Sequence, residues 1–259
     1  PLARIGGKGL FVKELETALA DGSADLAVHS MKDVPMNLPD GFTMAATGER
    51  EDARDAFVSN NFDNLESLPH GSIVGTSSLR RQSQIQARFP HLKIESLRGN
   101  VQTRLRKLDE GQYAAIILAA AGLIRLELGN RIRGFIAPTD SIPAVGQGAL
   151  GIEINANRTD LIEILAPLNH IDTQLCVEAE RAFSRALAGS CTVPLGAYAL
   201  KEGSTINITG FVASVDGKQM LRETTIGSIS NADAVGRALA DKLIERGANK
   251  ILAALDHIK

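Results

Sequence analysis

The chain has 259 residues, 44% of them hydrophobic, and its 28 basic and 30 acidic side chains nearly balance. A chain of this length and composition can bury a large core and is typical of a soluble globular protein with two or more domains. The most apolar run, residues 113–124, is too short to span a bilayer, and the five histidines and two cysteines have no zinc spacing. We therefore expect neither a membrane span nor a metal site.

The cysteine count indicates the cellular compartment of the protein, and the first residue indicates that the sequence continues upstream. Two cysteines are too few for a disulfide framework, so we expect a reducing, cytoplasmic compartment. The sequence contains no secretory signal. It opens on Pro1 rather than on Met, and we expect further residues upstream.

The charges are unevenly distributed along the chain. From Arg80 to Arg133 there are nine Arg and two Lys against four acidic residues, a net charge of +7, whereas the remainder carries −9. This segregation indicates a partner with several negative charges. Because Arg outnumbers Lys, bidentate recognition of carboxylate or phosphate is favoured over loose electrostatic steering.

The first predicted elements lead into a concentrated polar stretch. Apolar residues recur at helical spacing over residues 10–21, and Gly22 predicts the end of that helix. Residues 26–28 are typical of a short buried strand, which passes without a spacer into residues 29–35 (His-Ser-Met-Lys-Asp-Val-Pro). Strand ends of α/β folds present chemistry in this way, although a solvated strand end is the plainer interpretation of this stretch alone. A second strand is predicted over residues 42–46.

Strands and helices then alternate. The polar residues 47–52 indicate a crossing into a second domain. Predicted strands at residues 72–76, 92–97 and 114–118 are followed by helices that begin at Ser77 or Ser78, at Asn100 and at Ala119 and run to about residues 89, 110 and 128. This alternation predicts a parallel, doubly wound sheet with right-handed crossovers.

Two of the strand–helix junctions, residues 76–81 and 98–104, concentrate hydroxyl and guanidinium groups. Because helix N-termini present free backbone N–H groups, we predict an anion site at these junctions, extended by Arg125 one unit further on. The alternative is that these arginines have only structural roles. The glycines form neither a Rossmann fingerprint nor a Walker A motif, so a nucleotide is not indicated.

Residues 138–148 form a loop that we interpret as a second crossing, after which a strand (149–154) and a helix (159–168) return to the first domain. Two crossings between two α/β lobes predict a hinged cleft, as in solute-binding proteins. The predicted fold class is therefore α/β, with two doubly wound, hinged lobes of the periplasmic-binding-protein kind and a small α+β C-terminal domain.

The last third of the chain contains both cysteines. A helix is predicted over residues 172–188, and Cys176 lies beside its apolar stripe, which favours a core position. Cys191 instead lies in a loop between the end of this helix and Pro194, where it is placed to be an attachment point. Strands are predicted over residues 195–200, 205–214 and 218–226, and helices over residues 232–246 and 248–257.

Six stretches match one family in that family's order: residues 6–11, 28–35, 75–81, 97–101 and 143–148, and the loop around Cys191. On these motifs the chain resembles the hydroxymethylbilane synthase family, also called porphobilinogen deaminase. The resemblance implies an enzyme that joins four porphobilinogen molecules head to tail, with loss of ammonia at each step, into the linear tetrapyrrole hydroxymethylbilane. It also implies a dipyrromethane cofactor bound to Cys191 through a thioether.

The resemblance implies roles for particular residues. Asp33 matches the catalytic aspartate, which would assist departure of the amine and stabilise the cationic azafulvene. The implied cofactor contacts come from Cys191, Lys32, Asp33, Thr76, Ser77, Ser78, Arg80, Arg81, Arg98, Arg104 and Gln147. The implied contacts with substrate and growing chain come from Lys8, Arg81, Arg98, Arg104 and Arg125. An Arg-rich cleft suits a chain of pyrroles that each carry an acetate and a propionate.

The expected domains are residues 1–48 with 149–168, residues 49–148, and residues 169–259. Family members begin with a strand and a helix ahead of residue 1, so we expect the first domain to lack them. The substrate porphobilinogen is the expected partner of a monomer, without nucleic acid, since aromatic residues make up only 4% of the chain. The alternative is a two-lobed anion-binding protein without catalysis, which would give Cys191 and Asp33 no task.

Overall fold

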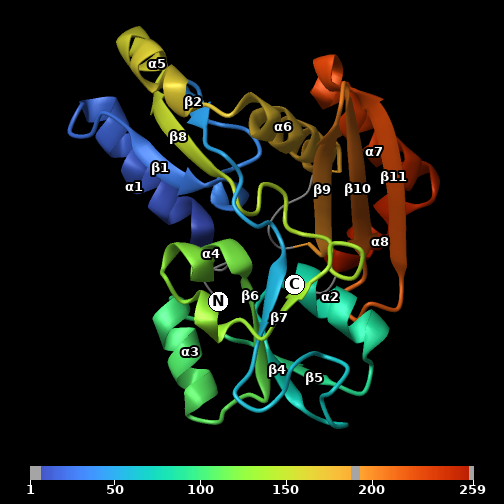
Figure 1. Ribbon diagram of the computed structural model, residues 1–259. Coiled ribbons are helices and arrows are strands. Elements are labelled where there is room, and N and C mark those ends of the chain that lie inside the picture. Colours follow the sequence, from blue (N-terminus) through green and yellow to red (C-terminus); the bar gives the residue numbers. More distant parts are fainter. Residues whose placement is uncertain (1–6, 188–192, 257–259) are drawn as a thin grey trace.

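The computed structural model describes residues 7–187 and 193–256, and the strands of this part of the chain form three separate sheets. Figure 1 shows two α/β lobes, one above the other, and a C-terminal domain beside the upper lobe. Two chain segments pass between the lobes, one ahead of residue 55 and one ahead of residue 150. The predicted arrangement of two lobes and a small C-terminal α+β domain is confirmed.

The first lobe contains the sheet β1-β8-β2. Its elements are α1 (Gly7–Asp21), β1 (Ala27–Ser30), the 3-10 turn η2 (Met31–Asp33), β2 (Phe42–Thr47), β8 (Leu150–Asn155), α5 (Thr159–Leu165) and the 3-10 turn η4 (Ala166–Leu168). The returning strand β8 lies between β1 and β2 and is antiparallel to both. The predicted helix over residues 159–168 becomes a 3-10 turn after Leu165, because Pro167 has no N–H to continue the α-helical hydrogen bonds.

The second lobe contains a five-stranded mixed sheet in the order β5-β4-β6-β3-β7. Its elements are β3 (Asp55–Val58), β4 (Ile73–Gly75), α2 (Leu79–Arg88), β5 (Lys93–Glu95), α3 (Val101–Asp109), β6 (Ala115–Ala119), α4 (Ala120–Arg125), the 3-10 turn η3 (Gly129–Arg131) and β7 (Gly134–Ile136). The three predicted strands β4, β5 and β6 pair in parallel, as expected. Two strands that we did not predict, β3 and β7, join this sheet in antiparallel orientation.

The helix α4 is shorter than predicted. It ends at Arg125 rather than at residue 128. Glu127 takes a left-handed φ of 58°, and the N–H of Leu128 donates to the carbonyl of Leu123 at 2.8 Å. This is the hydrogen bond of a Schellman C-cap, which reverses the chain at this point.

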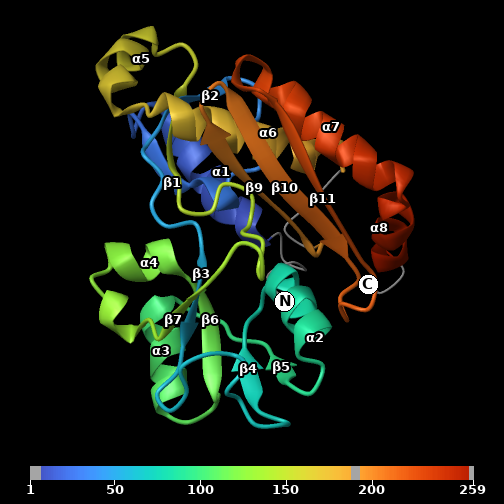
Figure 2. The same cartoon turned by 45° about the vertical axis from the view of Figure 1, so that its right-hand side comes forward.

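The C-terminal domain packs its helices on one face of an antiparallel sheet (Figure 2). Its elements are α6 (Ile171–Ala186), β9 (Leu195–Glu202), β10 (Thr205–Ala213), β11 (Met220–Ser228), the 3-10 turn η5 (Ile229–Asn231), α7 (Ala232–Glu245) and α8 (Ala248–Asp256). The helices α6 and α7 approach closely, since a Cβ on Gly236 would lie 2.0 Å from the carbonyl oxygen of Ala179. Phe183 of α6 is fully buried in the largest apolar core of the molecule.

One buried carboxylate joins both crossings and the C-terminal domain. Glu180 of α6 accepts two hydrogen bonds from the Arg50 guanidinium, at 2.6 and 3.1 Å, on the first crossing. It also accepts from the N–H of Gly146 on the second crossing at 2.7 Å and from the N–H of Ala199 in β9 at 2.9 Å. Glu180 has no exposed surface, so this joint fixes where the lobes meet the C-terminal domain.

Candidate active site

The carboxyl end of β1 runs directly into the turn η2, which carries Lys32 and Asp33 at the edge of the first lobe. Both side chains are half-buried. Met31, at the start of the turn, is 4% exposed, and the second crossing and β8 both approach it closely. A Cβ on Gly146 would lie 2.8 Å from the Met31 Cβ, and a Cβ on Gly151 would lie 2.2 Å from the Met31 Sδ. The turn that carries Asp33 is therefore tightly held.

The second lobe presents the two predicted strand–helix junctions on one edge of its sheet, because β4 and β5 are parallel. Ser78 is the N-cap of α2 and accepts from the N–H of Arg81 at 3.4 Å. Asn100 is the N-cap of α3 and accepts from the N–H of Thr103 at 2.8 Å. Both predicted caps are confirmed, and the N-termini of two helices open on this edge of the lobe.

Hydroxyl groups link the two junctions. The Ser77 hydroxyl donates to the carbonyl of Leu97 at 2.8 Å and lies 2.9 Å from the Ser96 hydroxyl. Thr76 is buried, and its hydroxyl accepts from the N–H of Ser78 at 3.2 Å. The junctions are thus one continuous polar surface rather than two separate loops.

Arg98 and Arg104 lie at the second junction. Arg98 is exposed, and its Nε is 3.4 Å from the Ser96 hydroxyl. Arg104 is half-buried, and its Nε donates to the carbonyl of Gly99 at 2.7 Å. Burial lowers the pKa of the Arg104 guanidinium, and the Asp33 carboxylate acts in the opposite direction by stabilising its charge. Asp33 of the first lobe and Arg104 of the second therefore interact electrostatically.

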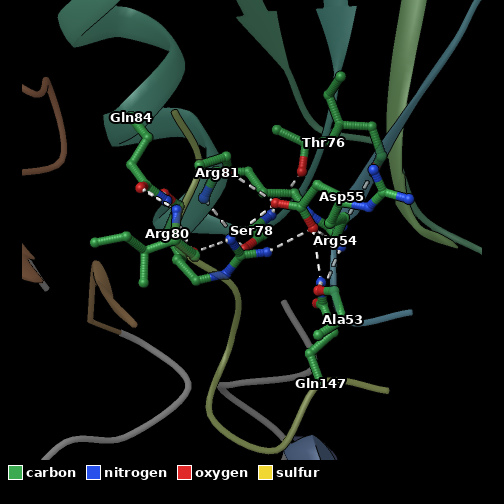
Figure 3. A network of polar contacts seen from close by, with 12 residues as sticks. Ala53, Arg54, Asp55, Thr76, Ser78, Arg80, Arg81, Gln84 and Gln147 are labelled. Carbon is green, nitrogen blue, oxygen red and sulfur yellow. Dashed lines mark hydrogen bonds and ion pairs between the residues drawn. The ribbon is translucent and has the colours of Figure 1, made fainter. Parts of the chain in front are cut away.

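Three further predicted site residues converge on a carboxylate that the sequence analysis did not single out (Figure 3). Asp55, the first residue of β3, has no exposed surface. Arg80 donates two hydrogen bonds to it at 2.9 Å, and the Arg81 Nε donates a third at 3.0 Å. The Gln147 amide donates to Asp55 at 3.0 Å and to the carbonyl of Ala53 at 2.7 Å.

The Asp55 network has a clear electrostatic consequence. Burial alone would raise the pKa of the Asp55 carboxyl, but Arg80 and Arg81 outweigh this and hold its pKa far below the usual range. Arg80 is 5% exposed and Arg81 is 7% exposed, so both guanidinium groups lie largely inside the protein. The hydrogen bonds to Asp55 join β3, α2 and the second crossing. The signal for Asp55 in the sequence was an acidic residue directly before a short apolar run, which is too brief to predict a partner.

The remaining predicted site residues are Arg125, Lys8 and Cys191. Arg125 is exposed at the end of α4, and one of its Nη atoms donates to the carbonyl of Gly148 in the second crossing at 2.8 Å. Lys8 belongs to α1, but its side chain lies outside the described structure. Cys191 also lies outside the described residues, between α6 and β9.

Cys176 faces the core of the C-terminal domain, as predicted. It is 6% exposed, and burial raises the pKa of its thiol to about 11. Since the thiolate is the reactive form, this cysteine is chemically inert at neutral pH.

Two further features concern membranes and metal ions. No helix within residues 7–187 and 193–256 is long and apolar enough to cross a membrane. Among the side chains of the same residues, no group of three or more His, Cys, Asp or Glu is arranged to hold a metal ion.

Comparison with known proteins identifies matching families and relatives. Residues 1–163 match the family model described as "Porphobilinogen deaminase, dipyromethane cofactor binding domain", and residues 174–245 match "Porphobilinogen deaminase, C-terminal domain". A porphobilinogen deaminase of Methylobacillus flagellatus is 73% identical over 99% of this chain and 83% of its own length. That of Chromobacterium violaceum is 62% identical over 98% of this chain and 82% of its own length.

Similarity to solved structures is lower. A crystal structure described as a putative methionine-binding lipoprotein from Bacillus subtilis is 13% identical, with a TM-score of 0.42, over 61% of this chain and 75% of that one.

Proposed function

The chain belongs to the porphobilinogen deaminase family, and from this we infer that it carries out the family's reaction with residues that face one another between its two lobes. The enzyme is a transferase, hydroxymethylbilane synthase, that condenses four porphobilinogen molecules with loss of ammonia into hydroxymethylbilane on a dipyrromethane cofactor. The observation that carries the assignment of roles is the electrostatic interaction of Asp33 with Arg104, which brings a carboxylate of one lobe to the cationic edge of the other.

The residues at this edge fit a dipyrromethane. Its acetate and propionate groups need cationic and hydroxyl donors, and the second lobe offers Arg98, Arg104 and Ser77 beside two helix N-termini. Lys32 adds a cation from the first lobe. When bound, the cofactor supplies the pyrrole carbon to which the first substrate molecule is coupled. We assign its attachment to Cys191, since Cys176 is buried in the core.

The arginines divide into two groups by their contacts. Arg98 and Arg125 are exposed and Arg104 is half-buried, so we propose that these three bind carboxylates of substrate and growing chain. Arg80 and Arg81 bind Asp55, and we propose that they shape the cofactor site by fixing the N-terminus of α2. We also propose that the cofactor is contacted by Thr76, Ser78 and Gln147.

Asp33 is the proposed catalytic residue. Departure of ammonia from the substrate aminomethyl group leaves a positive charge on the pyrrole, and a carboxylate near the ring nitrogen stabilises that charge. Each coupling then releases a proton, which a carboxylate in the same place can accept. The neighbouring Lys32 and Arg104 cannot stabilise a cation, because they carry the same charge.

We further propose the division of the chain into residues 1–48 with 149–168, residues 49–148, and residues 169–259. The three separate sheets support this division. We also propose that the protein acts as a monomer in the cytoplasm. The small number of cysteines supports a reducing compartment.

The intact mass of the purified enzyme tests the cofactor assignment. We expect the wild-type mass to exceed that of the polypeptide by one dipyrromethane, and the adduct to colour with an aldehyde reagent for pyrroles. Cys191→Ser should lose the adduct, whereas the matched control Cys176→Ala should keep it. If both variants keep the adduct, the attachment point is wrong. A wild-type protein without any adduct would instead favour a binding protein without catalysis.

A further inference from the structure

A buried arginine of the C-terminal domain binds the chain segment that directly follows Asp33. Arg181 lies on α6 and is 9% exposed. Its guanidinium donates to three consecutive backbone carbonyls: those of Val34 at 3.4 Å, Pro35 at 2.5 Å and Met36 at 3.1 Å. Among the described residues none of its hydrogen bonds goes to a carboxylate. Within this part of the chain Arg181 therefore binds backbone carbonyls and does not form an ion pair.

This contact requires the shape of a guanidinium. The carbonyls of residues 34–36 belong to an irregular segment, in which Pro35 has no N–H, so a neighbouring strand could not pair with it regularly. A planar group with five N–H donors can satisfy several such carbonyls at once. Burial disfavours the charged form of this guanidinium, and desolvation lowers the pKa of Arg181 to about 10.

An apolar contact holds the same two elements together. Val177, one helical turn before Arg181, is 2% exposed and packs in one cluster with Met31 and Val34. Two contacts with α6 therefore hold the turn that carries Asp33. Val177 packs in the cluster that contains the Met31 side chain before Asp33, and Arg181 binds the backbone carbonyls after Asp33.

The helix α6 has a second connection to the proposed chemistry. It ends at Ala186, and Cys191 follows only five residues later in the sequence. The element that holds the Asp33 turn is therefore also the element from which the cofactor loop departs. Arg98 and Arg104 lie in the second lobe, whose sheet is separate from the sheet that contains β1.

We propose that Arg181 is a positioning residue for the condensation reaction. It holds the segment after Asp33 against α6, so that the carboxylate stays at one place relative to that helix through all four couplings. The proposal rests on the proposed roles of Asp33 and Cys191. It predicts a specific defect, since a displaced Asp33 slows every coupling alike, whereas loss of a carboxylate-binding arginine affects particular stages of chain growth.

The test compares Arg181→Gln with Arg185→Gln. Arg185 is a matched control on the same helix, because it pairs with Asp233 of α7 at 2.9 Å and has no hydrogen bond to the Asp33 segment. We expect Arg181→Gln to keep the covalent cofactor and a nearly unchanged KM but to lose about 10²-fold in kcat, the scale expected for a reacting group displaced by about 1 Å. Arg181→Lys, which keeps the charge and can reach fewer carbonyls, should lie between this variant and wild type.

Intact-mass spectra during turnover supply the second readout. For Arg181→Gln we expect complexes with one, two and three added substrate units to persist in similar proportion, while Arg185→Gln should match wild type. Wild-type kcat in Arg181→Gln, a stall at a single stage, or an equal kcat loss in both variants would overturn the proposal. The proposed function fails separately: if Asp33→Asn keeps full turnover, then Asp33 is not the catalytic group, whatever Arg181→Gln does.

Discussion

At the scale of single residues, the proposed catalytic carboxylate lies beside cations. Lys32 precedes Asp33 in the sequence, and Arg104 interacts with it from the other lobe. The cations suit the carboxylates of the substrate, but they would repel the positive charge that develops when ammonia leaves. Only the carboxylate has the sign of charge that this step needs, so binding and catalysis are assigned to different residues.

Replacement of Asp33 by Asn should therefore separate binding from catalysis. We expect Asp33→Asn to fold and to bind porphobilinogen, yet to turn over ~10²–10⁴-fold more slowly, the usual effect of removing a positioned acid–base group. Asp33→Glu keeps the charge in a shifted position and should retain more activity than Asp33→Asn. Steady-state rates of porphobilinogen consumption provide the measurement, with circular dichroism as the control for folding. Turnover close to wild type in Asp33→Asn would point to another carboxylate.

At the scale of secondary structure, β3 organises the second lobe. Its first residue, Asp55, binds Arg80 and Arg81 of α2 and also accepts from the Ser141 hydroxyl at 2.8 Å and from Gln147. One buried carboxylate thus fixes the helix N-terminus at the first junction relative to the second crossing. Loss of its charge would leave two buried guanidinium groups without compensation.

The Asp55→Asn variant should lose stability in a pH-dependent way. We expect a decrease of about 3–5 kcal/mol in the free energy of unfolding at pH 7, as for other broken buried ion pairs. The folded pKa of Asp55 is lowered, so its contribution is present above the unfolded value of about 3.9 and is lost as the pH falls below it. The difference between wild type and variant should shrink by about 1.4 kcal/mol per pH unit below pH ~4.

Denaturant unfolding at a series of pH values between 7 and 3 checks this expectation. A control is Asp63→Asn, since Asp63 is an exposed residue of the second lobe outside the Asp55 network. A difference that stays constant from pH 7 to pH 3 would show that the charge of Asp55 does not stabilise the fold.

The elements that the sequence predicted are those with local signals. The units β4–α2 and β5–α3 were predictable because apolar strands are followed by the capping residues Ser78 and Asn100. The strands β3 and β7 were not predicted, since each is a short run that leads into a loop rather than into a capped helix. Their antiparallel placement is decided by pairing with distant strands, which no local pattern encodes.

Contacts between residues far apart in the sequence also limited the prediction of the site. The motifs predicted Arg80, Arg81 and Gln147 as members of one site, and the structure brings them together. Their common partner Asp55 lies 25 residues from Arg80 in the sequence and 92 from Gln147. Arg181 was likewise missed, because its contacts reach a segment about 146 positions earlier in the chain.

At the scale of the whole molecule, the two crossings between the lobes meet the C-terminal domain at Glu180. Its Oε1 accepts from an Arg50 Nη and from the N–H of Ala199, and its Oε2 accepts from the other Arg50 Nη and from the N–H of Gly146. Every hydrogen bond is donated to the carboxylate. An amide at this position would turn its NH₂ group toward two donors in either orientation, so charge and acceptor geometry are both required.

Glu180→Gln should therefore be more harmful than Arg50→Met. We expect each variant to lose about 3–5 kcal/mol of stability, with Glu180→Gln at the upper end, because it leaves a buried cation and also opposes backbone N–H donors. The double variant should not recover the stability of Arg50→Met. In that variant the amide of residue 180 still faces a backbone N–H, of Gly146 or of Ala199, whichever way it is turned.

Calorimetry of these variants tests whether Glu180 couples the crossings between the lobes to the C-terminal domain. If the joint holds the units together, Glu180→Gln should broaden unfolding or divide it into separate transitions of the lobes and the C-terminal domain. Glu110→Gln is the control, since Glu110 is exposed and its carboxylate contacts the exposed Arg106 at 3.7 Å and the Gln112 amide at 2.9 Å, and exposed pairs add little stability. A single transition with an unchanged midpoint in Glu180→Gln would mean that the lobes are held to the C-terminal domain by their apolar contacts alone.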